Sequence, residues 1–115
     1  ERDSIIATLP IGYADGYTRM LTGKGQVYVE GKLAPIVGKI CMDQMMVDLT
    51  GIDQASMDSE VILFDYEDGS ITMEDLANKL GTVNYEIMCM MGRRLPRVYI
   101  ENGRPSHIVD YLLNT

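Results

Sequence analysis

The chain has 115 residues, of which 46% are hydrophobic and 23% are charged, so it is long enough and apolar enough for one domain with its own core. Its formal net charge of −7 argues against binding to nucleic acid or to an anionic membrane surface. No segment has the length of a transmembrane helix, and no signal-peptide pattern opens the chain. Because the chain begins at Glu1 without an initiator methionine, we interpret residues 1–115 as one domain of a longer protein.

The first third of the chain has the alternating pattern of β-strands separated by turns. Residues 4–9 and 26–30 each alternate apolar and polar side chains. Glu30-Gly31-Lys32 is a turn signal, after which the chain is expected to return as a partner strand from Leu33. Between the first two strands, two glycines within residues 11–17 bracket a tyrosine and an aspartate, which predicts a sharp turn of the backbone.

Residues 35–49 predict two further strands with a break between them. Alternate residues are apolar over 36–40 and again over 45–49, whereas Cys41-Met42-Asp43-Gln44 continues neither alternation. A break of this kind can turn a backbone N–H out of the sheet and offer it to a ligand. The alternative is a β-bulge or a tight corner of a small barrel, with Met42 filling the core. Periodicity alone favours this second interpretation.

After an irregular polar stretch, the chain is expected to form a strand and then a helix. Residues 60–65 are strongly apolar and predict the strand, and residues 66–70 predict a turn. Thr72 is a suitable N-cap for the helix, and Gly81 is a suitable C-terminal stop.

The last third of the chain predicts a second helix and two more strands. Residues 84–92 are apolar on nearly all sides, so we expect this helix to be mostly buried, with Arg93-Arg94 suiting its C-terminal end. Residues 96–100 and 107–113 predict the strands, and the turn between them is expected at 102–105. Six or seven strands and two short helices indicate a mainly β, barrel-like domain with antiparallel or mixed strands.

Several common functional patterns are absent from the sequence. Residues 22–25 lack the spacing of a phosphate-binding loop, and the acidic residues over 65–74 lack the glycine and glutamate positions of a calcium-binding loop. His107 is the only histidine, so no zinc cluster and no Ser/His/Asp triad can be assigned, and a place on a surface strand is expected for it. Cys41 and Cys89 lie in apolar surroundings without a C-x-x-C motif, which favours two reduced, buried thiols in a cytoplasmic protein.

Four blocks of sequence stand out: Pro10-Ile11-Gly12-Tyr13-Ala14-Asp15-Gly16-Tyr17, Val37-Gly38-Lys39-Ile40-Cys41-Met42-Asp43-Gln44, Thr82-Val83-Asn84-Tyr85-Glu86 and Leu95-Pro96-Arg97-Val98-Tyr99. In this order they resemble the C-terminal domain of alanine racemase, a pyridoxal-phosphate enzyme. The resemblance runs from about Ile5 to Tyr99. Serine racemases of the vancomycin-resistance type share this domain, so the resemblance is compatible with either amino acid.

The resemblance implies a two-domain enzyme that interconverts L- and D-alanine, or serine, for cell-wall precursors. In this family an N-terminal barrel carries pyridoxal phosphate on a lysine, and the C-terminal domain reaches the active site of the other subunit of a homodimer. The two opposed bases are that lysine and a tyrosine in an upstream S-Y-G motif. This chain contains neither motif, so we assign it no catalytic base and expect no activity from it alone. The family implies a cytoplasmic enzyme, or a membrane-tethered one for the vancomycin-resistance type.

The resemblance assigns supporting roles to individual residues. Met42 matches the residue whose backbone N–H meets the substrate carboxylate, and Tyr85 matches the residue whose hydroxyl contacts the cofactor phosphate. Residues that line the substrate corridor in the family match Tyr13, Arg19, Lys39 and Val83. At the position of Lys39, the family often has arginine. Without the resemblance, Tyr13 and Tyr85 would be interpreted as half-buried barrel tyrosines, and Arg19 and Lys39 as solvated side chains. A non-catalytic β-barrel module for binding or oligomerisation is the alternative function.

Overall fold

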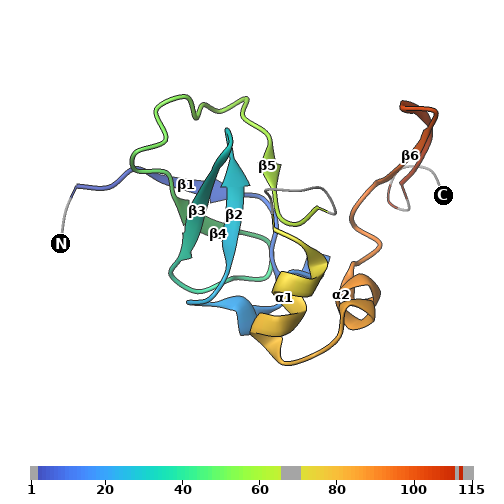
Figure 1. Ribbon diagram of the computed structural model, residues 1–115, viewed down its shortest axis with the longest axis horizontal. Helices are drawn as coiled ribbons and strands as arrows, with labels where there is room; N and C mark the ends of the chain where they lie inside the picture. Colours follow the sequence, from blue (N-terminus) through green and yellow to red (C-terminus); the bar gives the residue numbers. More distant parts are fainter. Residues whose placement is uncertain (1–2, 66–70, 111, 113–115) are drawn as a thin grey trace.

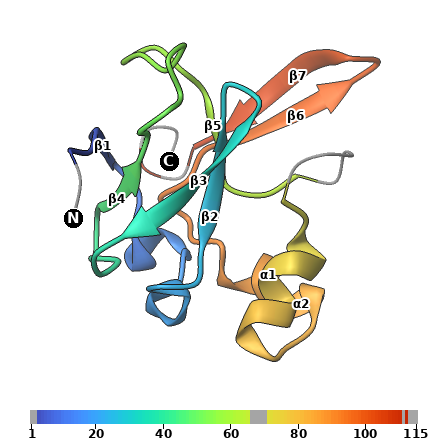
Figure 2. The same ribbon diagram turned by 60° about the vertical axis from the view of Figure 1, so that its left-hand side comes forward.

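A computed structural model describes residues 3–65, 71–110 and 112, and its main element is a curled five-stranded antiparallel sheet with the order β1-β4-β3-β2-β5. Figure 1 shows helices α1 and α2 below this sheet and, at the right, the end of the chain projecting from the body as a hairpin. Turning the molecule separates the two strands of the hairpin (Figure 2). The elements are β1 (Ile6–Leu9), η1 (Tyr13–Asp15), η2 (Arg19–Leu21), β2 (Gln26–Val29), β3 (Lys32–Val37), β4 (Met45–Asp48), β5 (Val61–Ile62), α1 (Met73–Leu80), α2 (Asn84–Met90), β6 (Arg97–Glu101) and β7 (Arg104–Val109). The predicted mainly β architecture with two short helices is confirmed.

The sheet curls because β3 pairs with different strands along its length. Residues 32–35 of β3 pair with β2, whereas Ile36 and Val37 pair with Val47 and Met46 of β4. The buried members of the alternating patterns form one hydrophobic core, and α1 adds Leu76 and Ala77 to it. The buried strand residues are Leu9, Val27, Val29, Ala34, Ile36, Met45 and Val47. The result is half of a barrel, with β1 and β5 at the two ends of the strand order.

Three predicted local signals are confirmed in atomic detail. Glu30 and Gly31 have φ values of 48° and 78°, the geometry of the two-residue turn that matches the twist of antiparallel strands. Thr72 caps α1: its hydroxyl accepts a hydrogen bond from the Asp75 N–H at 3.1 Å, and the Asp75 carboxylate accepts one from the Thr72 N–H at 2.8 Å. Gly81 ends the helix with φ at 73°.

The strand boundaries differ most from the sequence predictions in three places. The strand expected over 36–40 ends at Val37, because Gly38 adopts a φ of 68° that turns the chain out of the sheet. The strand expected over 60–65 is only Val61–Ile62, because two residues are all that pair with β2. The last strand begins at Arg104, immediately after a turn at Asn102 and Gly103. The expected turn at 66–70 lies outside the described residues.

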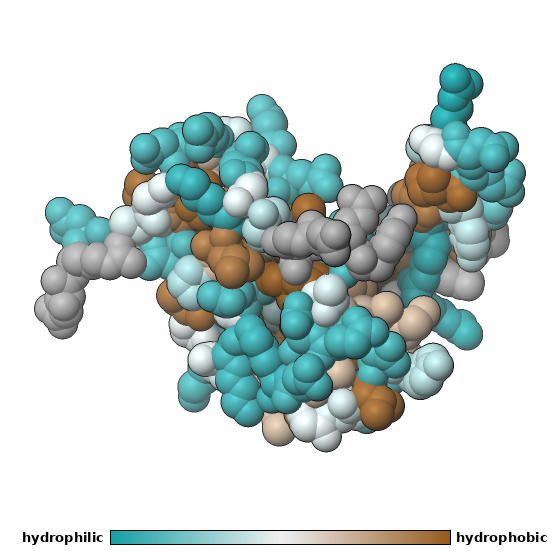
Figure 3. Space-filling view, in the orientation of Figure 1, coloured by the Kyte–Doolittle hydropathy of each residue, from teal (hydrophilic) through white to brown (hydrophobic). Residues whose placement is uncertain are grey.

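Helix α2 is largely exposed, so the prediction that it is mostly buried was wrong. Ile87 is its one buried residue, whereas Tyr85 is 75% exposed and Met88 is 58% exposed. Cys89 on this helix and Cys41 are both free and exposed, which also contradicts the prediction of buried thiols. Figure 3 shows hydrophobic residues at the surface of the projecting hairpin as well, whereas the surface around α1 is mostly hydrophilic. The apolar side chains of α2 therefore form a surface and not a core. Among the described residues, no helix has the length and hydrophobicity needed to cross a membrane.

Candidate functional site

Three segments that are far apart in the sequence meet at one place: the turn 12–16, the loop 38–44 and the segment 90–94. The Tyr13 N–H donates to the Cys41 carbonyl at 2.9 Å, and the Ala14 N–H donates to the Met42 carbonyl at 3.0 Å. On the other side of the turn, the Gly92 N–H donates to the Asp15 carbonyl at 2.9 Å. The turn predicted within residues 11–17 is confirmed, and it connects the loop that carries Met42 to the end of α2.

Glycine is required in this turn because other backbone segments approach it closely. A Cβ atom at Gly12 would lie 2.1 Å from the Cys41 carbonyl oxygen and 2.5 Å from that of Met42. A Cβ atom at Gly16 would lie 2.2 Å from the Met90 carbonyl oxygen, and its φ of 110° also favours glycine. The two glycines thus let the loop and the end of α2 pack directly against the turn.

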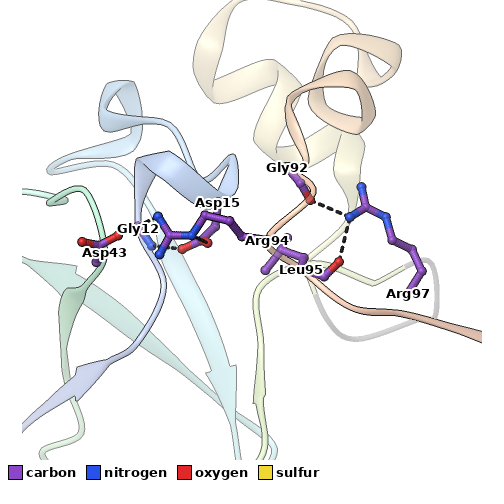
Figure 4. Close-up of polar contacts among 7 residues, drawn as sticks. All are labelled: Gly12, Asp15, Asp43, Gly92, Arg94, Leu95 and Arg97. Carbon is purple, nitrogen blue, oxygen red and sulfur yellow. Dashed lines mark hydrogen bonds and ion pairs between the residues drawn. The ribbon is translucent and has the colours of Figure 1, made fainter. Parts of the chain in front are cut away.

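A buried carboxylate lies at the centre of this arrangement. Asp15 is only 4% exposed, and its Oδ2 accepts a hydrogen bond from the Gly12 N–H at 3.0 Å. Its Oδ1 lies 3.2 Å from Nε of Arg94, and Nη1 of Arg94 lies 2.7 Å from Oδ1 of Asp43 (Figure 4). The hydrogen bond to Asp43 is the main reason why the pKa of Arg94 is raised. Arg94 therefore bridges the turn and the loop.

A second arginine holds the segment from which Arg94 extends. Nη1 of Arg97 donates to the carbonyl oxygens of Gly92 at 2.5 Å and Leu95 at 2.7 Å, and Nη2 donates to that of Met91 at 3.2 Å. Figure 4 shows the side chains of Arg94 and Arg97 pointing to opposite sides of the chain. Because Arg97 donates to three backbone carbonyl oxygens between Met91 and Leu95, it fixes the path of the backbone that carries Arg94.

Met42 lies at the exposed side of the loop and does not fill the core. It is 52% exposed, and the Cys41 N–H donates to the Gln44 carbonyl at 3.0 Å to close the turn around it. The Met42 carbonyl is bonded to Ala14, whereas no group among residues 3–65 and 71–110 accepts a hydrogen bond from the Met42 N–H. The corner therefore presents a backbone donor at a fixed position.

Tyr13 and Arg19 lie together beside this corner. The Arg19 guanidinium carbon is 5.9 Å from the centre of the Tyr13 ring, and a shallow cavity of about 330 Å³ is lined by Tyr13, Gly16, Thr18, Arg19 and Met90. The exposed Lys39 belongs to the same loop as Met42. Val83 and Tyr85 are at the opposite end of α2, where Val83 is 61% exposed. The structure thus groups Tyr13 and Arg19 with the loop that carries Met42 and Lys39, whereas Val83 and Tyr85 are exposed at the start of α2.

A larger cavity, of about 510 Å³, opens between β1, β5 and the loop 56–59. Its lining residues include Leu9, Val47 and Leu63, and the described residues contribute the hydroxyls of Thr8, Ser56 and Ser59 as polar side-chain groups. Among the described residues, no titratable side chain lines this cavity. Within the described ranges, no group of three or more histidine, cysteine, aspartate or glutamate side chains could hold a metal ion.

Sequence reasoning missed Asp15, Asp43 and Arg94 as partners. The ion pairs join residues that are 51 and 79 positions apart in the chain, counting from Arg94 to Asp43 and to Asp15. A local signal was nevertheless present: Asp15 follows Gly12 by three residues, the spacing at which a carboxylate caps a backbone N–H.

Comparison with known proteins identifies one family. The sequence profile described as "Alanine racemase, C-terminal domain" matches residues 1–99. Alanine racemase 1 of Clostridium acetobutylicum is 50% identical over 113 residues, which are 97% of this chain and 29% of that protein. The structure of alanine racemase from Bacillus anthracis with bound L-Ala-P is similar with a TM-score of 0.87 and 39% identity, over 97% of this chain and 28% of that one. Alanine racemase from Bartonella henselae with covalently bound pyridoxal phosphate is similar with a TM-score of 0.75 and 37% identity, over 84% and 28% of the two chains.

Proposed function

Because this chain belongs to the alanine racemase C-terminal domain family, we propose that it is the C-terminal domain of a pyridoxal-phosphate-dependent racemase that interconverts L- and D-alanine. The chain spans 29% of the length of alanine racemase 1 of Clostridium acetobutylicum. The cofactor lysine and the tyrosine base would belong to the remainder of the full-length protein, which we call the parent enzyme. In this proposal residues 1–115 help to bind and position the substrate and the cofactor, and they carry no catalytic base.

The Met42 N–H, which has no hydrogen-bond acceptor among the described residues, is the observation that carries the proposal. A backbone N–H that has no partner among the described residues is suited to donate to the carboxylate of an amino acid, and such charge-assisted bonds are stronger than neutral ones. The loop is fixed by the bonds from Tyr13 and Ala14, so the donor is held in place before the substrate arrives. The role depends on the backbone, and the methionine side chain need not take part.

The residues around this corner fit a path for a small amino acid. Tyr13, Arg19, Lys39 and Val83 would line it, and the two cations would attract a carboxylate toward a protein whose net charge is −7. Serine would be the alternative substrate. A cytoplasmic location is proposed for an alanine racemase, and a membrane-tethered one for a serine racemase of the vancomycin-resistance type.

Tyr85 fits a bound cofactor. Its side chain is 75% exposed, and its hydroxyl makes no hydrogen bond to the described residues, so a neutral donor is available for a phosphate oxygen. Pyridoxal phosphate, when bound, would supply an electron sink for the negative charge that develops at the substrate α-carbon. The exposed apolar surface of α2 would pack against the N-terminal barrel or the second subunit of a homodimer, since a surface of this kind is typical of an interface.

The experiment replaces the Met42 amide with an ester in the parent enzyme by semisynthesis. The ester removes the N–H and keeps the side chain, so kcat/KM should fall by roughly tenfold or more, because a hydrogen bond to a charged group contributes about 1.5–3 kcal/mol. Met42→Leu is the matched control and should be mild, since it preserves the amide and approximately the volume. Chain 1–115 alone should show no turnover.

Two outcomes would contradict this proposal. If the ester variant had the kcat/KM of the parent enzyme while Met42→Leu lost most of its activity, the methionine side chain would be the functional group. A parent protein that neither binds pyridoxal phosphate nor racemises alanine would favour the alternative, a non-catalytic module whose exposed helix serves association.

A further inference from the structure

We propose that Arg94 is a positioning residue that fixes the Met42 N–H by holding Asp43 to the buried Asp15. The inference rests on the proposed function, because it assigns a support to the loop that would bind the substrate carboxylate. Arg94 itself lies on a different segment and acts through Asp43, the residue next to Met42 in the chain.

The geometry favours this role because the two ends of the bridge differ in burial. The Asp15 side chain is 5% exposed, whereas the Asp43 side chain is 60% exposed. Asp15 is also fixed by the Gly12 N–H at 3.0 Å, so it is the anchored end. Asp43 belongs to the exposed loop, and within the described residues the 2.7 Å contact with Nη1 of Arg94 is its one ion pair. Restraint therefore passes from the buried carboxylate through the guanidinium to the loop.

Arginine suits this bridge better than lysine. Its Nε and Nη1 atoms contact two different carboxylates at the same time, which requires the planar, forked guanidinium group. The bonds from Arg97 to the carbonyl oxygens of Gly92 and Leu95 hold the backbone from which Arg94 extends. The bridge is thus supported at its base as well as at its two ends.

A double-mutant cycle in the parent enzyme tests the inference. Arg94→Gln should raise KM for alanine roughly tenfold, with kcat and the affinity for pyridoxal phosphate nearly unchanged, because a loosened loop weakens the binding of the substrate carboxylate. Asp43→Ala should raise KM by a similar factor, and the double variant should be no worse than either single variant. Arg94→Lys should restore only part of the loss. Arg104→Gln, a change at an exposed arginine of the hairpin β6–β7, is the matched control and should leave KM unchanged.

The outcomes separate this role from others. If Arg94 only cancelled the charge of Asp43, Asp43→Ala would lower KM, and this result would overturn the positioning role. Additive single effects, or an Arg94→Gln variant with the KM of the parent enzyme, would also overturn it. Failure of the proposed function looks different, because in that case the unmodified parent enzyme would neither retain pyridoxal phosphate nor racemise alanine.

Discussion

Gly12→Ala tests the contact on which the candidate site is built. The backbone at Gly12 has a φ of −155°, which alanine adopts without strain, so the cost of the change comes from contacts alone. The new Cβ atom would lie 2.1 Å from the Cys41 carbonyl oxygen and 2.5 Å from that of Met42. Both contacts involve backbone atoms, which cannot move aside by changing a rotamer, so the loop would have to retreat by roughly 1 Å to reach ordinary contact distances.

The size of the effect follows from what that retreat breaks. The hydrogen bonds from the Tyr13 and Ala14 N–H groups to the loop would lengthen or break, at about 1 kcal/mol each. Overpacking of a close contact adds about 1–3 kcal/mol. We therefore expect the free energy of unfolding to fall by about 3–5 kcal/mol, which is a large share of the stability of a small domain.

Urea unfolding of chain 1–115, followed by circular dichroism, measures this difference. Gly92→Ala is the matched control, since its Cβ atom would lie 3.2 Å from the Ala14 carbonyl oxygen and needs only a few tenths of an ångström of adjustment. The control should cost about 1 kcal/mol or less. A Gly12→Ala variant as stable as Gly92→Ala would refute the close packing of the turn against the loop.

Three further predictions concern Tyr85 and Tyr17. Tyr85→Phe in the parent enzyme should weaken cofactor binding by about 1.5–3 kcal/mol with the fold intact, as measured by titrating the apo-enzyme with pyridoxal phosphate; unchanged affinity would make Tyr85 a packing residue. Tyr17→Phe should raise the free energy of unfolding by about 1–3 kcal/mol in a urea titration, because the Tyr17 hydroxyl is buried without a hydrogen-bond partner among the described residues. A large loss of stability would instead show that the hydroxyl has a partner. Burial also raises the pKa of Tyr17 from 10.0 to about 12. Because the unfolded state therefore ionises first, the wild-type chain should lose up to about 3 kcal/mol of stability between pH 10 and 12. An equal loss of stability in Tyr17→Phe over this pH range would contradict the explanation.

Local features of the fold were predictable because each depends on residues that are neighbours in the sequence. The alternation of Val27 with Val29 selects one face of a strand, and the Glu30-Gly31 turn and the Thr72 cap depend on residues at most three positions apart. The end of β3 at Val37 was not predictable from alternation, because the left-handed backbone of Gly38 interrupts a pattern that continues to the buried Ile40. The length of β5 depends on how many residues β2 can pair, which is a tertiary property.

The exposure of α2 was not predictable for a different reason. An apolar helix face looks the same in the sequence whether it contacts the core of its own domain or the surface of another. The structure separates the two cases, since Ile87 contacts the core while Tyr85 and Met88 do not. The bridge from Asp15 through Arg94 to Asp43 was missed because both carboxylates are distant from Arg94 in the sequence.

The geometry of the site therefore restricts residue identity most at positions that do not contact the substrate. If the Met42 N–H binds the carboxylate, many side chains are acceptable at that position, because every residue except proline supplies the same donor. Residue identity is instead restricted at Gly12, where any Cβ atom collides with the loop, and at Arg94, where only a forked cation reaches both carboxylates. Substitutions at Gly12 and Arg94 should thus be tolerated less well than substitutions at Met42, although Met42 is the residue proposed to touch the substrate. A saturation library of the parent enzyme, selected for growth that depends on D-alanine, would give the opposite ranking if the side chain of Met42 were the functional group.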